Sequence, residues 1–596
     1  MPEKNTNEKG LAKGSPKTLA KTASKNKRPR KRGRGSQGGR KKGGPTLRII
    51  PLGGLDAIGK NMTAFECGGD IILVDAGLMF PDDEHTGVDL ILPDYTYVLE
   101  NADRLRGIVI THGHEDHTGA LPYLLKDLDR SVPILGTKLT LGLIEGKLEE
   151  HRLPRQPKLV EVHRGSSAKL GCFELEFFTV NHSIPGAMGV FMHTPAGNVL
   201  HTGDFKLDET PIDGELTDFA ALARFAAQGV DLLMSDSTNA TSKQFTKSEA
   251  EVGVTLRSVI GAARQRVVVA AFSSHIHRVQ QVCDAAQLAG RKVAVTGRSM
   301  LTNTRIAREL GYLNVPDDLI IDAYDVGNYP PEKTVVLCTG SQGEPLSALA
   351  RMSVGEHKTI DIERGDTVII SATPVPGNEK TVSNVVNKLF EKGAEVIYSD
   401  IADIHVSGHA SREELKLMHN LVRPKFFIPV HGEYHHIVKH AKLAESIGMP
   451  KENIFISEIG QILEFTRDKG QVVGKVTSGK VLIDGLGVGD VGNIVLRDRR
   501  QLSQDGILIV VVTMDKEGRF IAAGPDIVSR GFVYVRESEA LMEEAKERVT
   551  SAIEHCLDND ITEWSVIKND IREAIGRYLY EKTRRRPMIL PIIMEV

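Results

Sequence analysis

The residues best suited to chemistry in this sequence are gathered in one short segment. His112, His114, Asp116 and His117 stand close together directly after a short apolar run. Side chains two positions apart on an extended loop point the same way, so His112 and His114 can face one ion. Asp116 and His117 are adjacent where the chain turns into a helical pattern, and they can face a second ion. A histidine-rich surface loop that binds no metal is the alternative interpretation.

The ligand types in this segment limit the metal and its role. Imidazole and carboxylate groups together suit Zn²⁺ or Mn²⁺. A zinc site that contains histidine and aspartate but no cysteine is typical of hydrolytic rather than purely structural zinc. The sequence has five cysteines, all scattered and with no CxxC pair, which indicates reduced thiols rather than disulfides or metal ligands. The segment therefore predicts a hydrolytic metal centre.

Three further candidate ligands occur in comparable positions. His182, Asp204 and His431 each follow a short β-like run, in the segments VNHSIP, HTGDFK and IPVHGE. Polar residues at the exits of buried strands are where α/β folds place their sites. Each of the three alone would more often be a satisfied structural group. Together with the first segment, they supply enough ligands for two ions.

The elements that must position these residues alternate along the chain. Up to about residue 470, strand-like runs alternate with helical patterns such as 248–266 and 412–421. This alternation predicts an α/β architecture with buried sheets. From about residue 490 the pattern restarts, with a strand at 506–512 and helices near 538–558 and 562–581. The restart predicts a small, separate α+β domain.

Charge is distributed unevenly along the chain. Residues 1–42 contain 15 Lys and Arg but only two Glu, a net charge of +13, whereas the remaining residues carry 60 basic and 76 acidic side chains. The first 45 residues are almost free of apolar side chains, so we expect a disordered basic tail. Such a tail can bind a polyanion or simply aid solubility, and the sequence leaves both open.

Two locations are disfavoured by composition. No apolar run has the roughly 18–20 residues that cross a bilayer, which predicts that the protein does not span a membrane. The amino terminus lacks an apolar core followed by a cleavage site of small residues, which argues against secretion. We therefore expect a cytoplasmic protein.

Several of these residues resemble the leading motifs of the metallo-β-lactamase superfamily. Asp75 in LVDAG, the 112–117 segment, His182 and Asp204 match those motifs in order. The resemblance implies an αββα sandwich that binds two divalent cations per subunit, Zn²⁺ or Mn²⁺. Asp75 would lie behind the ligands and orient them. The ligand sets that the resemblance implies are His112, His114 and His182 for one ion, Asp116, His117 and His431 for the other, and Asp204 as the bridge.

The region after Asp204 resembles the β-CASP nucleases. About 225 residues separate Asp204 from His431, which indicates an inserted domain. The segments SDSTNA at 235, HVSGHA at 405 and PVHGE at 429 are similar to β-CASP motifs. From about residue 47 to the end, including RRPMILP at 585, the sequence resembles the ribonuclease J family. Ala57 and His275 depart from this family, which commonly has Glu and Asn at those positions.

The resemblance also implies a division into domains. We expect a metallo-β-lactamase domain in two parts, an inserted β-CASP α/β domain and a small C-terminal α+β domain. The expected limits are a tail at 1–45, the first part at 46–245, the β-CASP domain at 246–386, the second part at 387–465, a linker at 466–489 and the last domain at 490–596.

The activity that the resemblance implies is hydrolysis of RNA by a water activated between two metals. It includes 5′→3′ exonuclease action that prefers a 5′-monophosphate, together with endonuclease action, in ribosomal RNA maturation and messenger RNA decay. Asp116 and His409 would be catalytic. Partners would be RNA, further copies of the chain in a homodimer or homotetramer, and RNA-decay proteins. The residues expected to hold RNA phosphates are His405, Val406, Ser407, Gly408, His409, Ala410, Ser274 and His275.

Other functions remain open at this point. A lactonase, thioesterase or β-lactamase would use the same ligands, because this fold alone does not set the substrate. A β-CASP nuclease that processes DNA is a close variant. A non-catalytic RNA-binding scaffold would have lost ligands, yet all seven are present in the sequence.

Overall fold

The computed structural model describes residues 44–596 except 83, 154, 376, 400, 486, 516–518 and 534–538. Nearly all of the expected basic tail, residues 1–43, lies outside the described residues. Among the described residues, no helix is both long and apolar enough to cross a membrane. All five cysteines are free.

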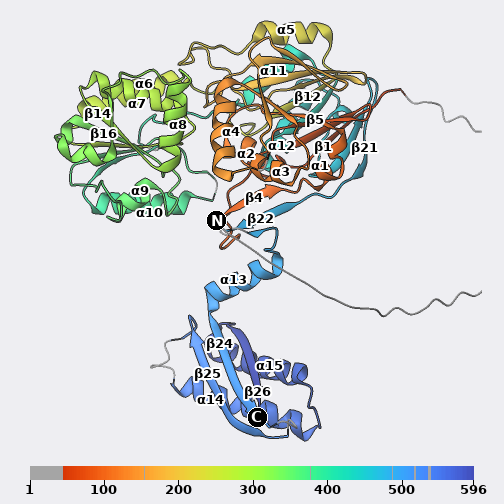
Figure 1. Cartoon of the computed structure of the whole chain (residues 1–596), viewed down its shortest axis with the longest axis vertical. Coiled ribbons are helices and arrows are strands. Elements are labelled where there is room, and N and C mark those ends of the chain that lie inside the picture. The colour runs from red at the N-terminus through yellow and green to blue at the C-terminus, as the bar shows by residue number, and fades with distance from the viewer. Residues whose placement is uncertain are drawn as a thin grey trace, which may run out of the picture. The chain divides into compact units, whose positions relative to one another are not determined.

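Two facing sheets form the first structural unit (Figure 1). One has eight strands in the order β21-β20-β1-β2-β3-β5-β6-β7, and the other has six in the order β19-β12-β11-β10-β9-β8. The strands of the first sheet are β1 (Leu47–Pro51), β2 (Thr63–Cys67), β3 (Asp70–Val74), β5 (Leu105–Val109), β6 (Pro133–Gly136), β7 (Lys158–Glu161), β20 (Gln461–Phe465) and β21 (Gly470–Lys475). Those of the second are β8 (Ser167–Leu170), β9 (Phe173–Thr179), β10 (Met188–Thr194), β11 (Gly197–His201), β12 (Leu232–Asp236) and β19 (Phe426–Val430).

A shared apolar core joins the two sheets. Ile49, Phe65 and Ile72 of the first sheet belong to one buried cluster with Phe177 and Met192 of the second. Helices cover the two outer faces, which gives the expected αββα sandwich. On the first sheet they are α1 (Thr96–Glu100), α3 (Leu121–Asp127) and α4 (Lys138–His151), and on the second α5 (Phe219–Gln228), α11 (Arg412–Val422) and α12 (Tyr434–Ser446).

The chain leaves this sandwich after β12 and returns to it at β19. Between them lies an all-parallel sheet in the order β15-β14-β16-β13-β17-β18. Its strands are β13 (Val267–Ala270), β14 (Lys292–Thr296), β15 (Ile320–Ile321), β16 (Thr334–Cys338), β17 (Thr367–Ile370) and β18 (Glu395–Ile397). One face is covered by α6 (Glu249–Ala262), α7 (Ile276–Leu288) and α8 (Arg298–Glu309), and the other by α9 (Ala348–Ser353) and α10 (Glu379–Glu391). The expected insertion is therefore a doubly covered α/β layer.

The last part of the chain forms the expected α+β domain. It consists of β24 (Ile507–Met514), β25 (Ile521–Arg530) and β26 (Met588–Glu595) against α14 (Glu539–Asp558) and α15 (Trp564–Thr583). Along β24 every second side chain is buried against the two helices, the alternation of a sheet covered on one face. The limits of the domains stay a prediction.

Short elements connect these parts. A small sheet joins β4 (Leu90–Pro93) to β22 (Lys480–Asp484) and β23 (Gly487–Val488), and α13 (Asn493–Asp505) leads into the last domain. The remaining elements are α2 (Glu115–Thr118) and the 3₁₀ turns η1 (Ala102–Arg104), η2 (Ala323–Asn328), η3 (Pro331–Lys333) and η4 (Lys451–Asn453).

Candidate metal centre

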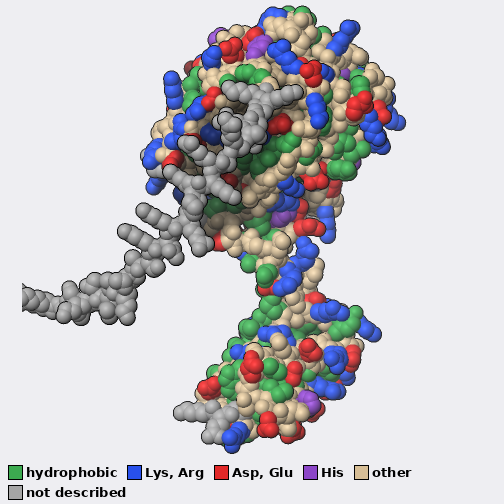
Figure 2. Space-filling model, turned by 90° about the vertical axis from the view of Figure 1, so that its right-hand side faces the viewer, with side chains coloured by type: hydrophobic (Ala, Val, Ile, Leu, Met, Phe, Trp, Pro, Cys, Tyr) green, Lys and Arg blue, Asp and Glu red, His purple; other side chains and the backbone are tan. Residues whose placement is uncertain are grey.

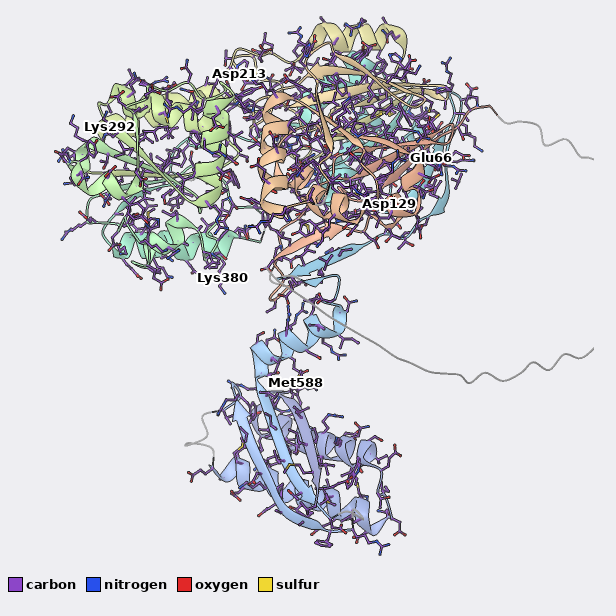
Figure 3. All side chains as sticks on the ribbon, viewed as in Figure 1. Glu66, Asp129, Asp213, Lys292, Lys380 and Met588 are labelled. Carbon is purple, nitrogen blue, oxygen red and sulfur yellow. The ribbon has the colours of Figure 1, made fainter. Side chains whose placement is uncertain are left out.

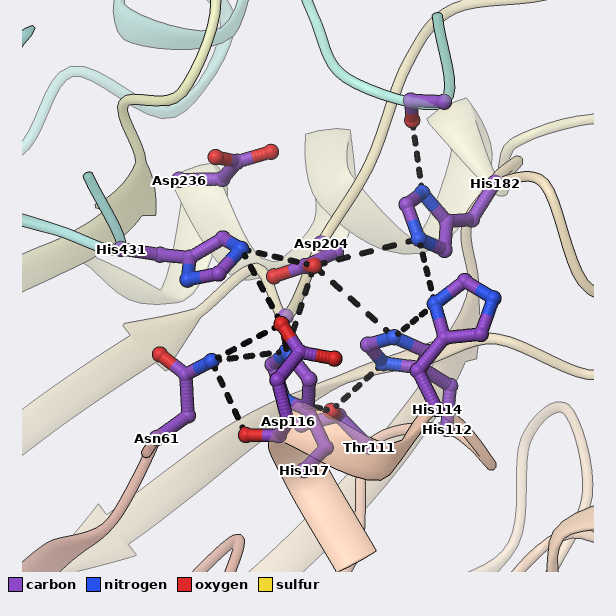
Figure 4. Close-up of polar contacts among 12 residues, drawn as sticks. Asn61, Thr111, His112, His114, Asp116, His117, His182, Asp204, Asp236 and His431 are labelled. Carbon is purple, nitrogen blue, oxygen red and sulfur yellow. Dashed lines mark hydrogen bonds and ion pairs between the residues drawn. The ribbon is translucent and has the colours of Figure 1, made fainter. Parts of the chain in front are cut away.

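Strand ends bring the expected ligands together at one edge of the sandwich. The 112–117 segment follows β5, Asp204 follows β11, and His431 follows β19. Neighbouring β3 and β5 are parallel, as are β11, β12 and β19. Because parallel strands end at the same edge of a sheet, residues that are far apart in the sequence meet there (Figure 4).

The side chains form two adjoining groups. Each group offers ligand atoms that all lie within 4.8 Å of one another. In the first group, Nδ1 of His114 lies 3.0 Å from Nε2 of His112 and 3.2 Å from Nε2 of His182. The two groups are His112, His114 and His182, and then Asp116, His117, Asp204 and His431.

Asp204 lies between the two groups. Its Oδ2 is 3.1 Å from Nε2 of His431 and 3.2 Å from Nε2 of His117. The same oxygen is 3.8 Å from Nε2 of His112 and 3.8 Å from Nε2 of His182. One carboxylate oxygen thus faces an imidazole nitrogen from each of four histidines.

The hydrogen bonds of the histidines test whether the group fits a cation. Nδ1 of His182 donates to the carbonyl oxygen of Gly408 at 2.7 Å, and Nδ1 of His117 donates to Oδ2 of Asp75 at 2.8 Å. Because Nδ1 carries the proton in both imidazoles, the free lone pair is on Nε2, and Nε2 points toward Asp204. Among the described residues, Nδ1 of buried His431 has no hydrogen-bond partner, and its Nε2 faces Oδ2 of Asp204 at 3.1 Å without the alignment of a hydrogen bond. Converging lone pairs beside a carboxylate are the donor set of a divalent cation.

Electrostatics agrees with this donor set. Burial lowers the pKa of His112 and of His182 well below the usual range, so both imidazoles are neutral and ready to bind metal. Burial also acts on His117 and His431, but the carboxylate of Asp204 outweighs it and raises the pKa of both. A positive charge is therefore stabilised beside Asp204.

Asp75 is hydrogen-bonded to the 112–117 segment and to the residue before it. Besides its contact with His117, its Oδ1 accepts a hydrogen bond of 2.8 Å from the backbone N–H of Thr111. Asp75 has a left-handed backbone, with φ of 61°. Oγ1 of Thr111 lies 3.0 Å from Nδ1 of His112. Thr111 thus connects Asp75 to the first group of ligands, a role that the sequence did not reveal.

Asn61 is a second residue that sequence reasoning did not assign. Its side-chain amide donates to the backbone oxygen of Asp116 at 3.1 Å and lies 3.0 Å from Nε2 of His117. The backbone at Gly77 also lies very close to this turn. Only glycine fits there, because a Cβ would lie 1.5 Å from the backbone oxygen of Asp116. Nothing in the sequence around Asn61 indicates a contact with residues 55 and 56 positions later in the chain.

His409 lies beside the ligands and is paired with Asp236. Its Nδ1 is 2.7 Å from Oδ2 of Asp236 and 3.9 Å from Oδ2 of Asp204. Burial lowers the pKa of His409, but the carboxylates of Asp236 and Asp204 outweigh it and raise the pKa to about 9. Asp236 ends β12 next to β19, which explains why it meets this loop. Its position at a strand end was the available signal for its role.

The 405–410 loop is held by contacts to the sandwich. Oγ of Ser407 accepts a hydrogen bond of 2.8 Å from Asn239, and the N–H of Ala410 donates to Phe205 at 2.6 Å. Val406 is buried. Burial lowers the pKa of His405 to about 3. Gly408 contacts His182 directly, which brings the loop against the first group of ligands.

The other expected phosphate loop lies at the start of α7. Ser274 is half-buried, and the imidazole of His275 is buried, with Nδ1 accepting from the N–H of Arg278 at 3.3 Å as the helix cap. Nε2 of His275 lies 3.6 Å from Oε2 of Glu249. His275 therefore belongs to a buried ionic cluster, and its contact with RNA stays a prediction.

A cavity of about 400 Å³ borders His182. Lys138, Arg164 and Lys206 of the sandwich line it together with His277 and Tyr312 of the inserted layer. Nε2 of His277 contacts Oδ2 of Asp213 at 3.1 Å, and Figure 3 labels Asp213 on the side of the sandwich that faces the inserted layer. The cavity thus lies between the two layers, and its lining mixes these basic side chains with the carboxylates of Glu161, Asp208, Asp213, Glu215 and Glu249.

The fold and the site define a metallo-β-lactamase-type hydrolase with an inserted nucleic-acid-processing domain. Residues 47–292 match the family model described as a beta-lactamase superfamily domain, and residues 393–457 match the Zn-dependent metallo-hydrolase RNA specificity domain. Residues 264–389 match the ribonuclease J beta-CASP domain, and residues 494–596 the ribonuclease J C-terminal domain. The chain belongs to the ribonuclease J family.

Similar proteins cover nearly the whole chain. It is 47% identical over 557 residues to Ribonuclease J2 of Bacillus subtilis, covering 94% of this chain and 100% of that one. It is 43% identical to Ribonuclease J 1 of Streptococcus pyogenes, covering 92% of this chain and 97% of the relative. A solved protein of unknown function from Enterococcus faecalis shares the fold, with a TM-score of 0.50, 15% identity and coverage of 72% and 100%.

Proposed function

We propose that this protein is a metal-dependent ribonuclease that hydrolyses RNA phosphodiester bonds. The observation that carries the proposal is the position of Asp204, whose Oδ2 lies 3.1–3.8 Å from Nε2 of four histidines. Membership of the ribonuclease J family supports RNA as the substrate. Two divalent cations bound here, Zn²⁺ or Mn²⁺, would supply a hydroxide nucleophile near neutral pH and neutralise charge on the phosphate.

The ligand assignments follow from the two groups of side chains. Asp204 would be a ligand of both ions, because its Oδ2 faces both groups of side chains. Asp75 and Asn61 would keep His117 and Asp116 in place through their hydrogen bonds. The proposed ligands are His112, His114 and His182 for one ion and Asp116, His117 and His431 for the other.

Two side chains would act on protons. Asp116 stands between the second group and solvent, with 29% of its side chain exposed, and would orient the attacking water or accept its proton. His409 keeps 18% of its side chain exposed, and its Nδ1 is engaged by Asp236, so its Nε2 is free to donate a proton or hydrogen bond at the scissile phosphate. Loss of the 3′-oxygen would leave a 5′-phosphate on the downstream product.

The RNA strand would occupy the cavity that borders His182, where Lys138, Arg164 and Lys206 could meet its phosphates. Backbone and side-chain donors of the 405–410 loop, together with Ser274 and His275, would bind a phosphate. We propose both 5′→3′ exonuclease action, with a preference for a 5′-monophosphate, and endonuclease action, in RNA maturation and decay. A homodimer or homotetramer, RNA-decay proteins as partners and a cytoplasmic location belong to the same proposal.

Cleavage assays test this function. The purified chain, supplied with Mn²⁺ or Zn²⁺, is incubated with 5′-labelled RNA and with DNA of matched sequence. We expect RNA to be cut, EDTA to stop the reaction, and a 5′-triphosphate RNA to be trimmed more slowly than the 5′-monophosphate form. Inertness toward RNA together with turnover of a lactone or thioester would overturn the proposal, and preference for DNA would correct the substrate.

The role of His409 has its own test. His409→Ala is expected to bind RNA but not to cut it, which also separates an enzyme from a non-catalytic scaffold. Unchanged cutting by this variant would remove the proposed role of His409.

A further inference from the structure

An unusual concentration of arginine lies in the C-terminal domain, at the end of α15. Arg584, Arg585 and Arg586 follow one another between α15 and β26, and all three are exposed. The chain outside residues 1–42 has fewer basic than acidic residues, 60 against 76. The cluster is therefore a local feature and does not reflect a generally basic protein.

Tyr580 holds two of these arginines together. The guanidinium carbon of Arg586 lies 4.4 Å from the centre of the Tyr580 ring, and that of Arg584 lies 5.5 Å from it. Arg584 ends α15 in a left-handed conformation, with φ of 58°, which turns the chain back over the ring. Cation–π contacts of this kind contribute about 0.5–1 kcal/mol each at exposed sites and bring the like charges close together.

The charges of this cluster are not neutralised within the domain. In the part of the chain that the structure describes, no carboxylate forms an ion pair with the side chains of Arg584, Arg585 or Arg586. Arg585 instead donates to the carbonyl oxygen of Phe532 at 2.8 Å. The nearby carboxylate of Asp505 accepts from the backbone N–H of Arg586 at 3.1 Å.

Helix α13 extends the same surface. Nε2 of Gln501 donates to the carbonyl oxygen of Arg586 at 3.0 Å, so one face of α13 lies against the cluster. Arg497 precedes Gln501 by one helical turn and has 73% of its side chain exposed, and unlike the three arginines of the cluster it contacts a carboxylate, that of Asp498, at 3.3 Å. Figure 3 labels Met588 near the end of α13, and Figure 2 shows Lys and Arg side chains along this helix and on the adjoining domain.

We infer that Tyr580, Arg584, Arg585, Arg586 and Arg497, here called the Tyr580 surface, bind the phosphates of single-stranded RNA away from the metal centre. Planar guanidinium groups match phosphate oxygens in pairs, and the Tyr580 ring keeps two of them in place. Because the substrate of the proposed ribonuclease is a long polyanion and most of the protein is acidic, a separate basic contact would hold the strand during cutting. This inference rests on the proposed function for the identity of the polyanion.

RNA binding by the full chain tests the inference. Fluorescence anisotropy is measured in EDTA, which prevents cutting, with a short RNA that fills only the cavity near His182 and a longer RNA with the same 5′ sequence. For Arg584→Gln/Arg586→Gln we expect roughly tenfold weaker binding of the long RNA, and a slope of log K against log salt that is shallower by about 1.4, since each lost phosphate contact removes about 0.7. Binding of the short RNA is expected to stay unchanged.

Two variants sharpen this result. Arg584→Lys/Arg586→Lys retains the charges and is expected to keep most of the salt dependence. Arg572→Gln, on an exposed part of α15, is the matched control and is expected to bind both RNAs as the wild type does. All variants are expected to unfold in one cooperative transition like the wild type, with only a small shift for Arg584→Gln/Arg586→Gln, which loses two cation–π contacts.

Two outcomes would overturn the inference. Unchanged binding of the long RNA by the glutamine variant would mean that the surface fits another partner, such as an acidic protein. Equal weakening for the short and the long RNA would mean that the variant acts through the cavity. Cutting of the short RNA separates failure of this inference from failure of the proposed function. It depends on the metal centre alone, so the glutamine variant is expected to cut the short RNA as the wild type does.

Discussion

Nδ1 of His182 donates a hydrogen bond of 2.7 Å to the carbonyl oxygen of Gly408, which lies 226 positions later in the chain. The first residue is a proposed metal ligand and the second belongs to the proposed phosphate loop. Fixing Nδ1 in this way directs the lone pair of Nε2 toward the other ligands. The bond therefore sets the geometry of the metal centre and the position of the loop together.

The first prediction concerns Gly408→Ala. A Cβ at Gly408 would lie 2.8 Å from both Nδ1 and Cε1 of His182, so the imidazole must move. We expect metal affinity at the first ion site to fall about 10–100-fold, with a similar loss of RNA cutting. Metal content by elemental analysis after dialysis, together with initial rates, measures both effects.

Gly261→Ala is the control for this change. Gly261 lies in α6, and a Cβ there has no heavy atom within 4 Å. This variant is expected to keep both ions and to be slightly more stable, because alanine favours a helix over glycine by about 1 kcal/mol. Full metal content in Gly408→Ala would contradict the proposed coupling.

The second prediction concerns Asp75→Asn. The change keeps an acceptor for the N–H of Thr111 but removes the carboxylate that receives Nδ1 of His117. We expect metal affinity at the second site to fall about 10–100-fold, and excess Mn²⁺ to restore much of the activity. Titration of the metal-free chain with Mn²⁺ gives the affinity. Asp129→Asn, at an exposed position, should titrate like the wild type, and an identical curve for Asp75→Asn would refute the role.

Asp236→Asn is the third prediction. Oδ2 of Asp236 lies 2.7 Å from Nδ1 of His409, so the amide would weaken the orientation and proton affinity of that imidazole. We expect kcat to fall on the order of 100-fold while both ions are retained. Adding Asp236→Asn to His409→Ala is expected to cost nothing further, because Asp236 acts through the His409 imidazole. Independent, multiplicative losses in steady-state kinetics would show that Asp236 acts elsewhere.

The sequence revealed the ligands better than the residues that support them. His182, Asp204 and His431 were recognisable because each follows an apolar run, and a strand end is a local pattern. Asn61 and Asp236 were not assigned, since their partners are set by which strands become neighbours. The pairing of β12 with β19, across the whole inserted domain, is such a long-range fact.

Interpretation of His275 shows the same limit. The resemblance to the ribonuclease J family implied a contact with phosphate, which stays a prediction; in the structure the imidazole caps α7 and faces Glu249 in a buried cluster. Burial and helix capping depend on how the inserted layer packs, which a single sequence does not show. The α/β and α+β division was predictable, because alternation of strand and helix patterns is local.

The last prediction concerns the buried pair of Arg278 and Glu249. Arg278 is fully buried, with Nε 2.7 Å from Oε1 of Glu249 and Nη1 2.7 Å from the carbonyl oxygen of Ile404. Arg278→Met leaves the carboxylate buried without its partner, so we expect the free energy of unfolding to fall by about 3–5 kcal/mol. Arg278→Met/Glu249→Gln removes both charges and is expected to recover part of this loss. Denaturant unfolding at neutral pH measures both variants.

The same pair predicts how stability depends on pH. Burial raises the pKa of the Glu249 carboxyl, but the positive charges of His275 and Arg278 outweigh it and hold the pKa well below its usual value of 4.5. The unfolded chain therefore binds the proton more readily than the folded one, and the stabilisation by this group is complete above the unfolded pKa and declines as pH falls below about 4. In Glu249→Gln that part of the decline is expected to disappear. Parallel stability curves for the wild type and Glu249→Gln between neutral pH and about pH 3 would contradict the assignment.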